Sequence, residues 1–196
     1  MKVIGLTGSF GTGKTFVASV FKSLGAKVLD ADKIAHDVIK KGRPAHRRIV
    51  AAFGVSVLAR GGNIDRKRLA GIVFEDIRKL KKLNSIVHPE VVAFIKSRID
   101  RTGGDDVIVI DAPLLVEASL TKITDSLVVV KASKARQVER CVKKFCMERE
   151  DVLKRIRHQI PMRKKVRMAD FVIDNDGTRS ETRRQAKKVW REIVWR

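Results

Sequence analysis

The strongest chemical signal in the sequence is the glycine-rich stretch "GSFGTGKT" at residues 8–15, which matches the pattern G-x-x-x-x-G-K-[ST]. Glycines let successive backbone N–H groups turn inward around a chain of phosphates, and the N-terminus of a following helix adds its dipole. In this pattern the lysine contacts the β- and γ-phosphates and the hydroxyl residue binds Mg²⁺. The stretch therefore predicts a magnesium ligand at Thr15 and an ATP site made of Gly8, Gly11, Thr12, Gly13, Lys14, Thr15 and Phe16.

The residues around this loop provide the context that the motif requires. The apolar stretch "MKVI" precedes it as a buried strand would, and "FVASVFKSLG" follows with the periodicity of a helix that closes at Gly25. An ordinary glycine turn between a strand and a helix is the alternative interpretation. A dinucleotide-binding loop is excluded, because Gly8, Gly11 and Gly13 do not have G-x-G-x-x-G spacing.

A second candidate for chemistry is the pair of carboxylates in "LDAD" (residues 29–32), where a strand-like segment ends. Residues two apart share one side of an extended segment, so Asp30 and Asp32 are predicted to face the same crevice. A carboxylate there can orient an acceptor hydroxyl and take its proton as the phosphoryl group leaves. Alternatively, Asp32 caps the helix that "KIAHDVI" predicts. The residue types and their position leave both interpretations open.

Two further positions carry a choice between function and structure. Asp111 ends the apolar run "VIVID", where a carboxylate either holds a magnesium-bound water or stabilises the following loop. The residues "PLL" that follow form either an apolar wall for a substrate tail or ordinary core. His88 precedes Pro89 inside a helical pattern, which predicts a kink or a boundary, and a lone histidine there is more often structural than a ligand contact.

Basic and polar residues occur near the predicted phosphate site. The segment "SKARQVERCVKKFC" places Arg136, Arg140 and Lys144 on one helical face. Arginine suits phosphate contact and stabilises charge on a transferring phosphoryl group, although a charge run is usually a solvated face. Asn175, in the polar turn "VIDNDG", either recognises a purine ring or only turns the chain.

The elements that must position these residues follow from the apolar pattern. Five β-branched runs are predicted as strands, at residues 2–7, 26–32, 105–113, 125–132 and 170–175. Runs this continuous indicate strands covered on both faces, hence an α/β fold with a parallel five-stranded sheet flanked by helices. Ligands bind such sheets at the carboxyl edge. Two helical stretches, residues 33–104 and 134–168, interrupt the alternation and predict an inserted helical region and a mobile lid.

Composition limits the class of protein. The chain has 196 residues, 44% of them hydrophobic, which suffices for the core of one domain. Its net charge of +21 attracts polyanions such as nucleic acid, acidic membranes or phosphorylated metabolites. Aromatic residues make up 5% and tyrosine is absent, so stacking platforms for single-stranded nucleic acid are few. Without a membrane-length apolar run or a signal peptide, the sequence predicts a soluble, cytoplasmic protein that does not enter membranes.

The order of these motifs resembles the dephospho-coenzyme A kinase family. The resemblance runs through "IGLTGSFGTGKT", "VLDADKIAHDV", "LNSIVHP", "DAPLLVE" and "ADFVIDNDG", nearly the whole chain. It implies a P-loop kinase in three parts: a nucleotide-binding core (1–32, 105–133 and 169–196), a helical acceptor region (33–104) and a lid (134–168). The implied reaction is ATP-dependent phosphorylation of the ribose 3′-hydroxyl of dephospho-coenzyme A, the last step of coenzyme A synthesis, with Mg²⁺ as cofactor.

The resemblance also implies roles for individual residues. Asp32 looks like the carboxylate that activates the 3′-hydroxyl, and Arg140 resembles an arginine at the hinge of the lid near the phosphates. The acceptor contacts that it implies are His88, Pro89, Leu114, Leu115 and Glu117. Two alternatives remain, namely another small-metabolite or nucleotide kinase, and a nucleic-acid-binding P-loop ATPase suggested by the basic charge. The oligomeric state stays open.

Overall fold

The computed structural model describes residues 1–104 and 106–195. The chain forms two compact units, Met1–Asp30 with Thr102–Arg196, and Ala31–Arg101. Each unit has its own hydrophobic core. A strand was predicted to begin at Asp105, and that residue is outside the described part of the chain.

The first unit is built on a five-stranded sheet in the order β2-β3-β1-β4-β5, in which every pair of neighbouring strands is parallel. The strands are β1 (Lys2–Thr7), β2 (Lys27–Asp30), β3 (Val107–Asp111), β4 (Ser126–Lys131) and β5 (Phe171–Asp174). All five residues of β3 are buried, as its unbroken apolar run indicates. The predicted parallel sheet is therefore confirmed.

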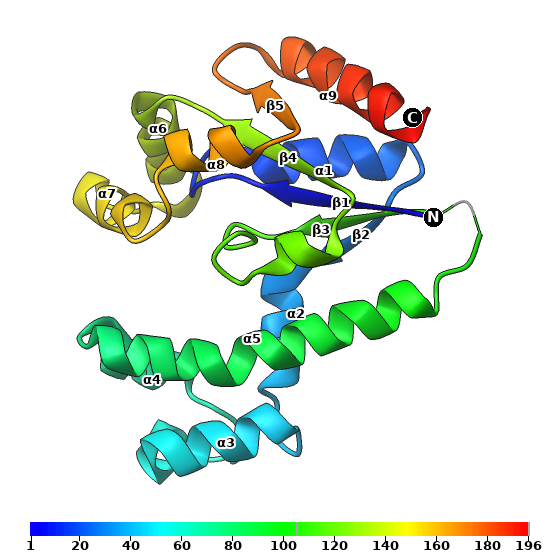
Figure 1. Cartoon of the computed structure of the whole chain (residues 1–196). Helices are drawn as coiled ribbons and strands as arrows, with labels where there is room; N and C mark the ends of the chain where they lie inside the picture. The colour runs from blue at the N-terminus through cyan, green and yellow to red at the C-terminus, as the bar shows by residue number, and fades with distance from the viewer. Residues whose placement is uncertain (105, 196) are drawn as a thin grey trace. The chain divides into compact units, whose positions relative to one another are not determined.

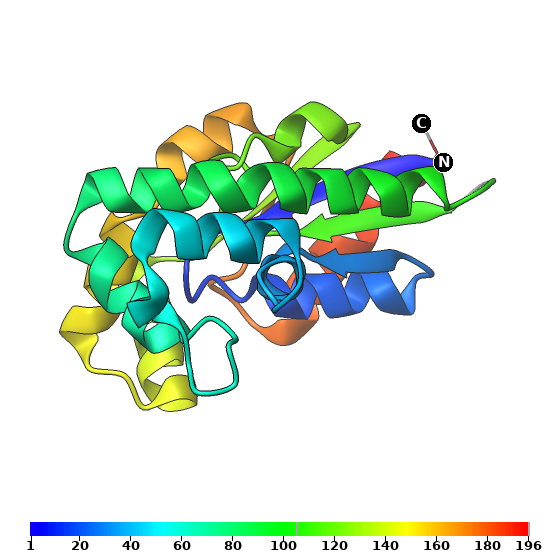
Figure 2. The same cartoon turned by 90° about the horizontal axis from the view of Figure 1, so that it is seen from below.

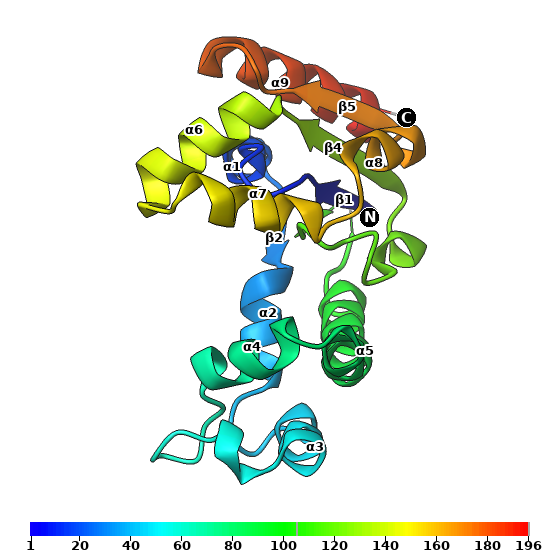
Figure 3. The same cartoon turned by 90° about the vertical axis from the view of Figure 1, so that its left-hand side faces the viewer.

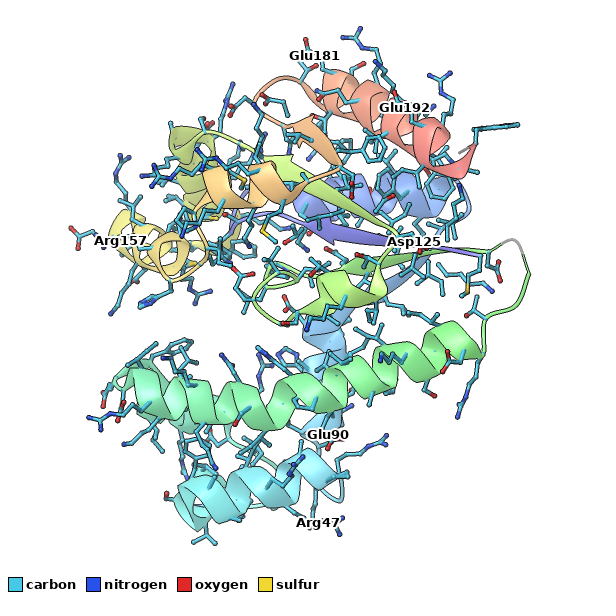
Figure 4. The ribbon with its side chains drawn as sticks, in the orientation of Figure 1. Arg47, Glu90, Asp125, Arg157, Glu181 and Glu192 are labelled. Carbon is cyan, nitrogen blue, oxygen red and sulfur yellow. The ribbon has the colours of Figure 1, made fainter. Side chains whose placement is uncertain are left out.

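Helices cover both faces of this sheet. The helices of this unit are α1 (Lys14–Ser23), α6 (Lys134–Phe145), α7 (Arg149–Arg157), α8 (Met162–Met168) and α9 (Arg179–Val194), with the short helix η2 (Leu120–Ile123). Of these, α6 and α7 lie beyond the ends of the strands (Figure 1). Figure 1 shows α1 and α9 side by side on one face, where Phe21 and Trp190 pack together. Helix α8 packs on β4. The start of α9 is set by a capping box of Thr178 and Glu181, the latter labelled in Figure 4.

The second unit is helical, with α2 (Ala31–Val38), α3 (Pro44–Phe53), η1 (Val55–Val57), α4 (Arg66–Phe74) and α5 (Ile77–Asp100). Figure 2 shows α5 as one long helix. A kink or a boundary was predicted at His88, and the boundary is wrong, because α5 continues through Pro89. Burial of Ile86, Val91 and Ile95 on both sides of the proline keeps the helix packed across the missing N–H donor.

The end of β2 also differs from the prediction. The strand stops at Asp30, and α2 begins at Ala31, so Asp32 lies in the first turn of a helix. Asp30 and Asp32 therefore do not share one side of an extended segment. The apolar spacing of Ala31, Ile34 and Val38, all buried, explains why the helix begins this early. Within the described residues, no helix combines the length and the apolar composition that crossing a membrane takes.

Candidate active site

The phosphate loop, residues 8–15, joins β1 to α1 at the carboxyl edge of the sheet. The backbone N–H and the hydroxyl of Thr12 both donate to the Ser9 carbonyl, at 3.1 and 2.9 Å. Gly11 and Gly13 have φ angles of 80° and 83°, in the left-handed region that glycine adopts readily. Both Ser9 and Thr12 are buried. Hydrogen bonds within the loop therefore fix its conformation, and its N–H groups and the N-terminus of α1 suit the binding of an anion.

Two side chains from distant parts of the chain hold the carbonyl of Thr12. Asn175 Nδ2 donates to it at 2.7 Å and Arg140 Nη1 at 3.3 Å. Arg140 Nη2 also donates to the Asn175 carbonyl at 2.7 Å, and Asn175 Oδ1 accepts from the Thr182 hydroxyl at 2.7 Å. Because both ends of its buried amide are engaged, the Asn175 side chain supports the phosphate loop, which differs from its predicted contact with a purine ring.

The hydrogen bonds from Asn175 and Arg140 to the Thr12 carbonyl lead to a prediction for the neighbouring Gly13. A Cβ atom there would collide with Asn175 Nδ2, and an alanine would also be strained at the positive φ angle. We expect Gly13→Ala to weaken ATP binding about tenfold or more, because the loop must shift away from Asn175. Gly25→Ala is the matched control: its φ angle is 103°, yet a Cβ there meets nothing within 4 Å. Equal loss of ATP affinity in both variants, measured by calorimetry, would contradict this explanation.

Lys14 and Asp111 form an ion pair at the mouth of the loop. Both side chains are largely buried, with 13% and 10% of their surfaces exposed. Burial raises the pKa of Asp111, and the ammonium group of Lys14 opposes that shift. Asp30, which lies opposite Asp111 in the β2–β3 register, raises the pKa further. The edge of the sheet therefore holds a cation and a carboxylate whose charges depend on each other.

Thr15 and Asp111 are the residues predicted to hold a metal ion. Thr15 lies exposed in the first turn of α1, next in sequence to Lys14, and Asp111 ends β3. A hydroxyl and a carboxylate are hard oxygen donors of the kind that Mg²⁺ takes. Among the described residues, no group of three or more His, Cys, Asp and Glu side chains could hold a metal. The donor set thus fits an ion that takes one or two protein ligands and completes its shell with phosphate and water.

The β3–η2 loop, residues 112–119, carries the predicted apolar wall. Leu114 is 39% exposed, which leaves its side chain accessible to a ligand. Leu115 is fully buried, and it packs closely against Gly5 of β1, so the prediction that it contacts the acceptor needs correction. It supports the loop from inside the core. Glu117 is part-buried and accepts hydrogen bonds from protein groups, as described below.

Helices α6 and α7 contact the phosphate loop through Phe10. Its backbone N–H donates to Gln159 Oε1 at 2.9 Å, and its ring stacks on Phe145 at 5.8 Å. The Arg155 guanidinium lies over the same ring, 5.3 Å from its centre. Figure 3 shows α6 and α7 next to the start of α1, where the Gly11 backbone packs on α6 at Gln137. The segment predicted as a lid therefore touches the loop that it would cover.

Phe16 follows the phosphate loop in the first turn of α1. Its ring is approached by two guanidinium groups from α9, those of Arg179 at 5.9 Å and Arg183 at 5.8 Å. These two cations stand near the start of α1, so the neighbourhood of the predicted ATP site is strongly positive.

The remaining predicted residues belong to the second unit. Asp32 is exposed in the first turn of α2, and on α5 His88 is part-buried while Pro89 is exposed. Helices α2 and α5 are neighbours within this unit. The predicted acceptor residues Asp32, His88 and Pro89 therefore come from two adjacent helices.

Two residues of this region had no signal in the sequence. Gln159 and Lys165 lie within or beside a run of lysines and arginines, and neither stands in a recognisable motif. The structure shows Gln159 bonded to the phosphate loop and Lys165 fully buried. Lys165 differs from the adjacent Lys164 only in being buried, whereas Lys164 is exposed. No local sequence pattern indicates which lysine of a basic helix is buried.

The sheet is parallel, a glycine-rich phosphate loop follows β1, a lysine opens α1, and a carboxylate closes the adjacent β3. Together these features define a P-loop nucleotide-binding protein. The sequence matches the family model described as dephospho-CoA kinase over residues 2–181. The chain therefore belongs to the dephospho-CoA kinase family, and the resemblance seen in the motifs is confirmed.

Relatives cover the chain from end to end. A protein named dephospho-CoA kinase from Aquifex aeolicus is 45% identical over 99% of this chain and 98% of its own length. Among solved structures, TT1252 from Thermus thermophilus is 32% identical, with a TM-score of 0.83 over 98% of this chain and 97% of that one. Dephospho-CoA kinase from Campylobacter jejuni is 27% identical, with a TM-score of 0.72 over 100% and 98%. The match extends through both units, and the chain is a phosphate-transferring enzyme.

Proposed function

We propose that this chain transfers the γ-phosphoryl group of ATP to the ribose 3′-hydroxyl of dephospho-coenzyme A, which completes coenzyme A. The observation that carries the proposal is the pairing of Lys14 with Asp111 at the mouth of the phosphate loop, in a member of this family. Family membership favours this acceptor over those of other small-metabolite kinases. Nothing in the described residues favours a nucleic-acid-dependent ATPase beyond the net charge.

On the nucleotide side, the phosphate loop binds the β- and γ-phosphates through its backbone N–H groups. Lys14 exchanges its contact with Asp111 for the phosphate oxygens, which carry more negative charge. Arg140 acts first as a support of the loop, through the Thr12 carbonyl, and lies close enough to the loop to face the phosphates when the lid closes. Most of the rate enhancement comes from positioning and from charge stabilisation, since phosphoryl transfer needs little covalent help from protein.

Thr15 and Asp111 would hold Mg²⁺ that arrives with ATP. Such an ion would supply positive charge that stabilises the transferring phosphoryl group. The exposed Thr15 hydroxyl can donate an oxygen directly, and Asp111 becomes available as Lys14 turns toward the phosphates. The ionised form of Asp111, which burial disfavours, is stabilised by either cation.

On the acceptor side, Asp32 accepts the proton of the 3′-hydroxyl as the phosphoryl group is transferred. His88 and Pro89 of α5, with Leu114 of the β3–η2 loop, contact the rest of the acceptor. Support for this assignment comes from the family motifs and from the exposure of Asp32, Pro89 and Leu114. Glu117, predicted as a further contact, instead fixes that loop, because its carboxylate is held by Lys165 and the Ile160 N–H.

The three predicted parts of the chain are retained in the proposal with one change. The acceptor region corresponds to the helical unit Ala31–Arg101. We place the moving part of the lid in α6 and α7 and end it before α8, because α8 packs on β4 and buries Lys165. Lid closure would exclude water, which competes with the acceptor hydroxyl. The enzyme would work in the cytoplasm, where ATP and Mg²⁺ are plentiful.

The deciding experiment is a coupled ADP-release assay with dephospho-coenzyme A and a panel of other hydroxyl acceptors, including shikimate and nucleoside monophosphates. We expect turnover with dephospho-coenzyme A alone, loss of turnover on chelation by EDTA, and recovery with added Mg²⁺. Product analysis should find the new phosphate on the ribose 3′-oxygen. Faster turnover with any other acceptor, or ADP release that nucleic acid stimulates, would refute the proposal.

A further inference from the structure

Lys165 is the only lysine that the described part of the chain buries. Its side chain is fully inaccessible, although it belongs to the short basic helix α8, where the neighbouring Lys164 is exposed. A buried ammonium group is costly unless other groups compensate its charge and its three donors. Its partners therefore show what this lysine holds together.

These partners lie in the β3–η2 loop. Lys165 Nζ donates to the carbonyl of Pro113 at 2.6 Å and lies 3.1 Å from Glu117 Oε1, so it contacts the loop near both ends. The Pro113 carbonyl also accepts from the hydroxyl of Thr7, the last residue of β1, at 3.2 Å. Since Gly8 follows Thr7 directly, this carbonyl joins the start of the phosphate loop to the loop after Asp111.

Through Glu117, the β3–η2 loop is joined to the turn between α7 and α8. The backbone N–H of Ile160 donates to Glu117 Oε1 at 3.0 Å, and the adjacent Gln159 accepts from the backbone N–H of Phe10 in the phosphate loop. Glu117 Oε2 is buried and has no hydrogen-bond partner among the described residues. The carboxylate of Glu117 thus depends on Lys165 for charge compensation, and residues 159–165 touch both loops at once.

Burial and the neighbouring carboxylate have opposite effects on the charge of Lys165. Burial lowers the pKa of Lys165, whereas the carboxylate of Glu117, 3.1 Å away, opposes that shift. The charge of Lys14 lowers the same pKa further, which places the two lysines within each other's field. The geometry and the pKa direction agree that the buried ammonium group depends on the carboxylate of Glu117 beside it.

We propose that Lys165 is a positioning residue for phosphoryl transfer, which couples the phosphate loop to the β3–η2 loop through Pro113 and Glu117. The proposal rests on the proposed function, because it assigns the β3–η2 loop to the acceptor side. By fixing that loop to Thr7 and to the Gln159–Ile160 turn, Lys165 makes nucleotide binding and acceptor binding depend on one another. Such a dependence is a coupling free energy that acts equally in both directions.

The test compares Lys165→Met with the wild type in steady-state kinetics and in binding. We expect the KM for dephospho-coenzyme A at saturating ATP to rise about tenfold, because the acceptor loop loses its anchor and the coupling is lost. Binding of an ATP analogue to the free enzyme should stay within about twofold of the wild type, since the bonds from Asn175 and Arg140 still hold the phosphate loop. Calorimetry would measure how far a non-hydrolysable ATP analogue tightens dephospho-coenzyme A binding. That tightening should disappear in Lys165→Met. Lys164→Met, one residue away on the exposed face of α8, is the matched control and should behave like the wild type.

A second variant separates positioning from folding. Lys165→Met leaves Glu117 without its cation, which can lower the melting temperature, so Lys165→Met/Glu117→Gln removes both charges. Glutamine still accepts from the Ile160 N–H. Melting near the wild-type temperature together with a high acceptor KM and lost coupling would support the role.

Each other outcome decides between explanations. A double variant with normal acceptor KM and normal coupling would overturn the role of Lys165. Weakening of ATP binding to the free enzyme by the same factor as the rise in acceptor KM would overturn it too, because it would mean a general disturbance of the site. If Lys165→Met does not fold, the acceptor KM and the coupling are compared between the double variant and Glu117→Gln alone. Wild-type protein that does not release ADP with dephospho-coenzyme A would instead refute the proposed function.

Discussion

Replacing Asp32 with asparagine should lower kcat about a thousandfold and leave the affinity for ATP nearly unchanged, because general-base catalysis typically contributes a factor of this order. Asparagine keeps the shape of the side chain and can still accept a hydrogen bond, but it cannot take the proton of the acceptor hydroxyl. The residue is exposed in the first turn of α2, so the exchange should not disturb packing. Single-turnover kinetics with saturating ATP and dephospho-coenzyme A would measure the chemical step directly.

The control for this variant is on the same helix. Asp37 lies in the last turn of α2 and pairs with Lys40, with 49% of its side chain exposed. That pair holds the pKa of Asp37 below its usual value, as expected for a carboxylate that only balances surface charge. Asp37→Asn should therefore turn over at close to the wild-type rate. Near-normal turnover by Asp32→Asn would remove Asp32 from the mechanism and leave it as a residue of the first helical turn.

The second large effect concerns Lys14. Lys14→Met should reduce kcat/KM for ATP about a thousandfold, because one preorganised charge aimed at the reacting group contributes on this scale. The exchange also leaves Asp111 buried without its cation, and burial already raises the pKa of that carboxyl. Loss of activity through misfolding would give the same kinetic result, so the melting temperature must be measured beside the rate.

Two companion variants make the Lys14 experiment decisive. Lys14→Met/Asp111→Asn removes the uncompensated carboxylate and should recover folding without recovering activity. Lys22→Met removes an exposed lysine from the last turn of the same helix and should leave the rate unchanged. Substantial kcat/KM in a well-folded Lys14→Met would mean that the loop N–H groups suffice for the phosphates, contrary to the proposed mechanism.

Much of the nucleotide site was predictable because its signals are local. The glycines at residues 8, 11 and 13, the adjacent lysine and hydroxyl, and the strand and helix on either side depend on neighbours within a few positions. The strands follow from continuous apolar runs, which indicate burial on both faces of a sheet, and the predicted parallel sheet was confirmed. The helical region of residues 33–104 was predictable from its apolar periodicity. Its Pro89 was misleading, because packing on both sides of the proline outweighs one missing N–H donor.

By itself, then, the sequence determined the phosphate loop, the strands and the family, since each is written in short-range spacing or in the order of motifs. Tertiary structure alone decided that the helix begins at Ala31 with Asp32 inside its first turn, that Leu115 belongs to the core, and which polar groups hold the phosphate loop. The bond from Asn175 to Thr12 joins residues 163 apart, and that from Lys165 to Pro113 joins residues 52 apart. Lys165 is one of 43 lysines and arginines, and its sequence neighbours do not distinguish it. It becomes distinct only in the folded chain, which buries it beside the carbonyl of Pro113 and the carboxylate of Glu117.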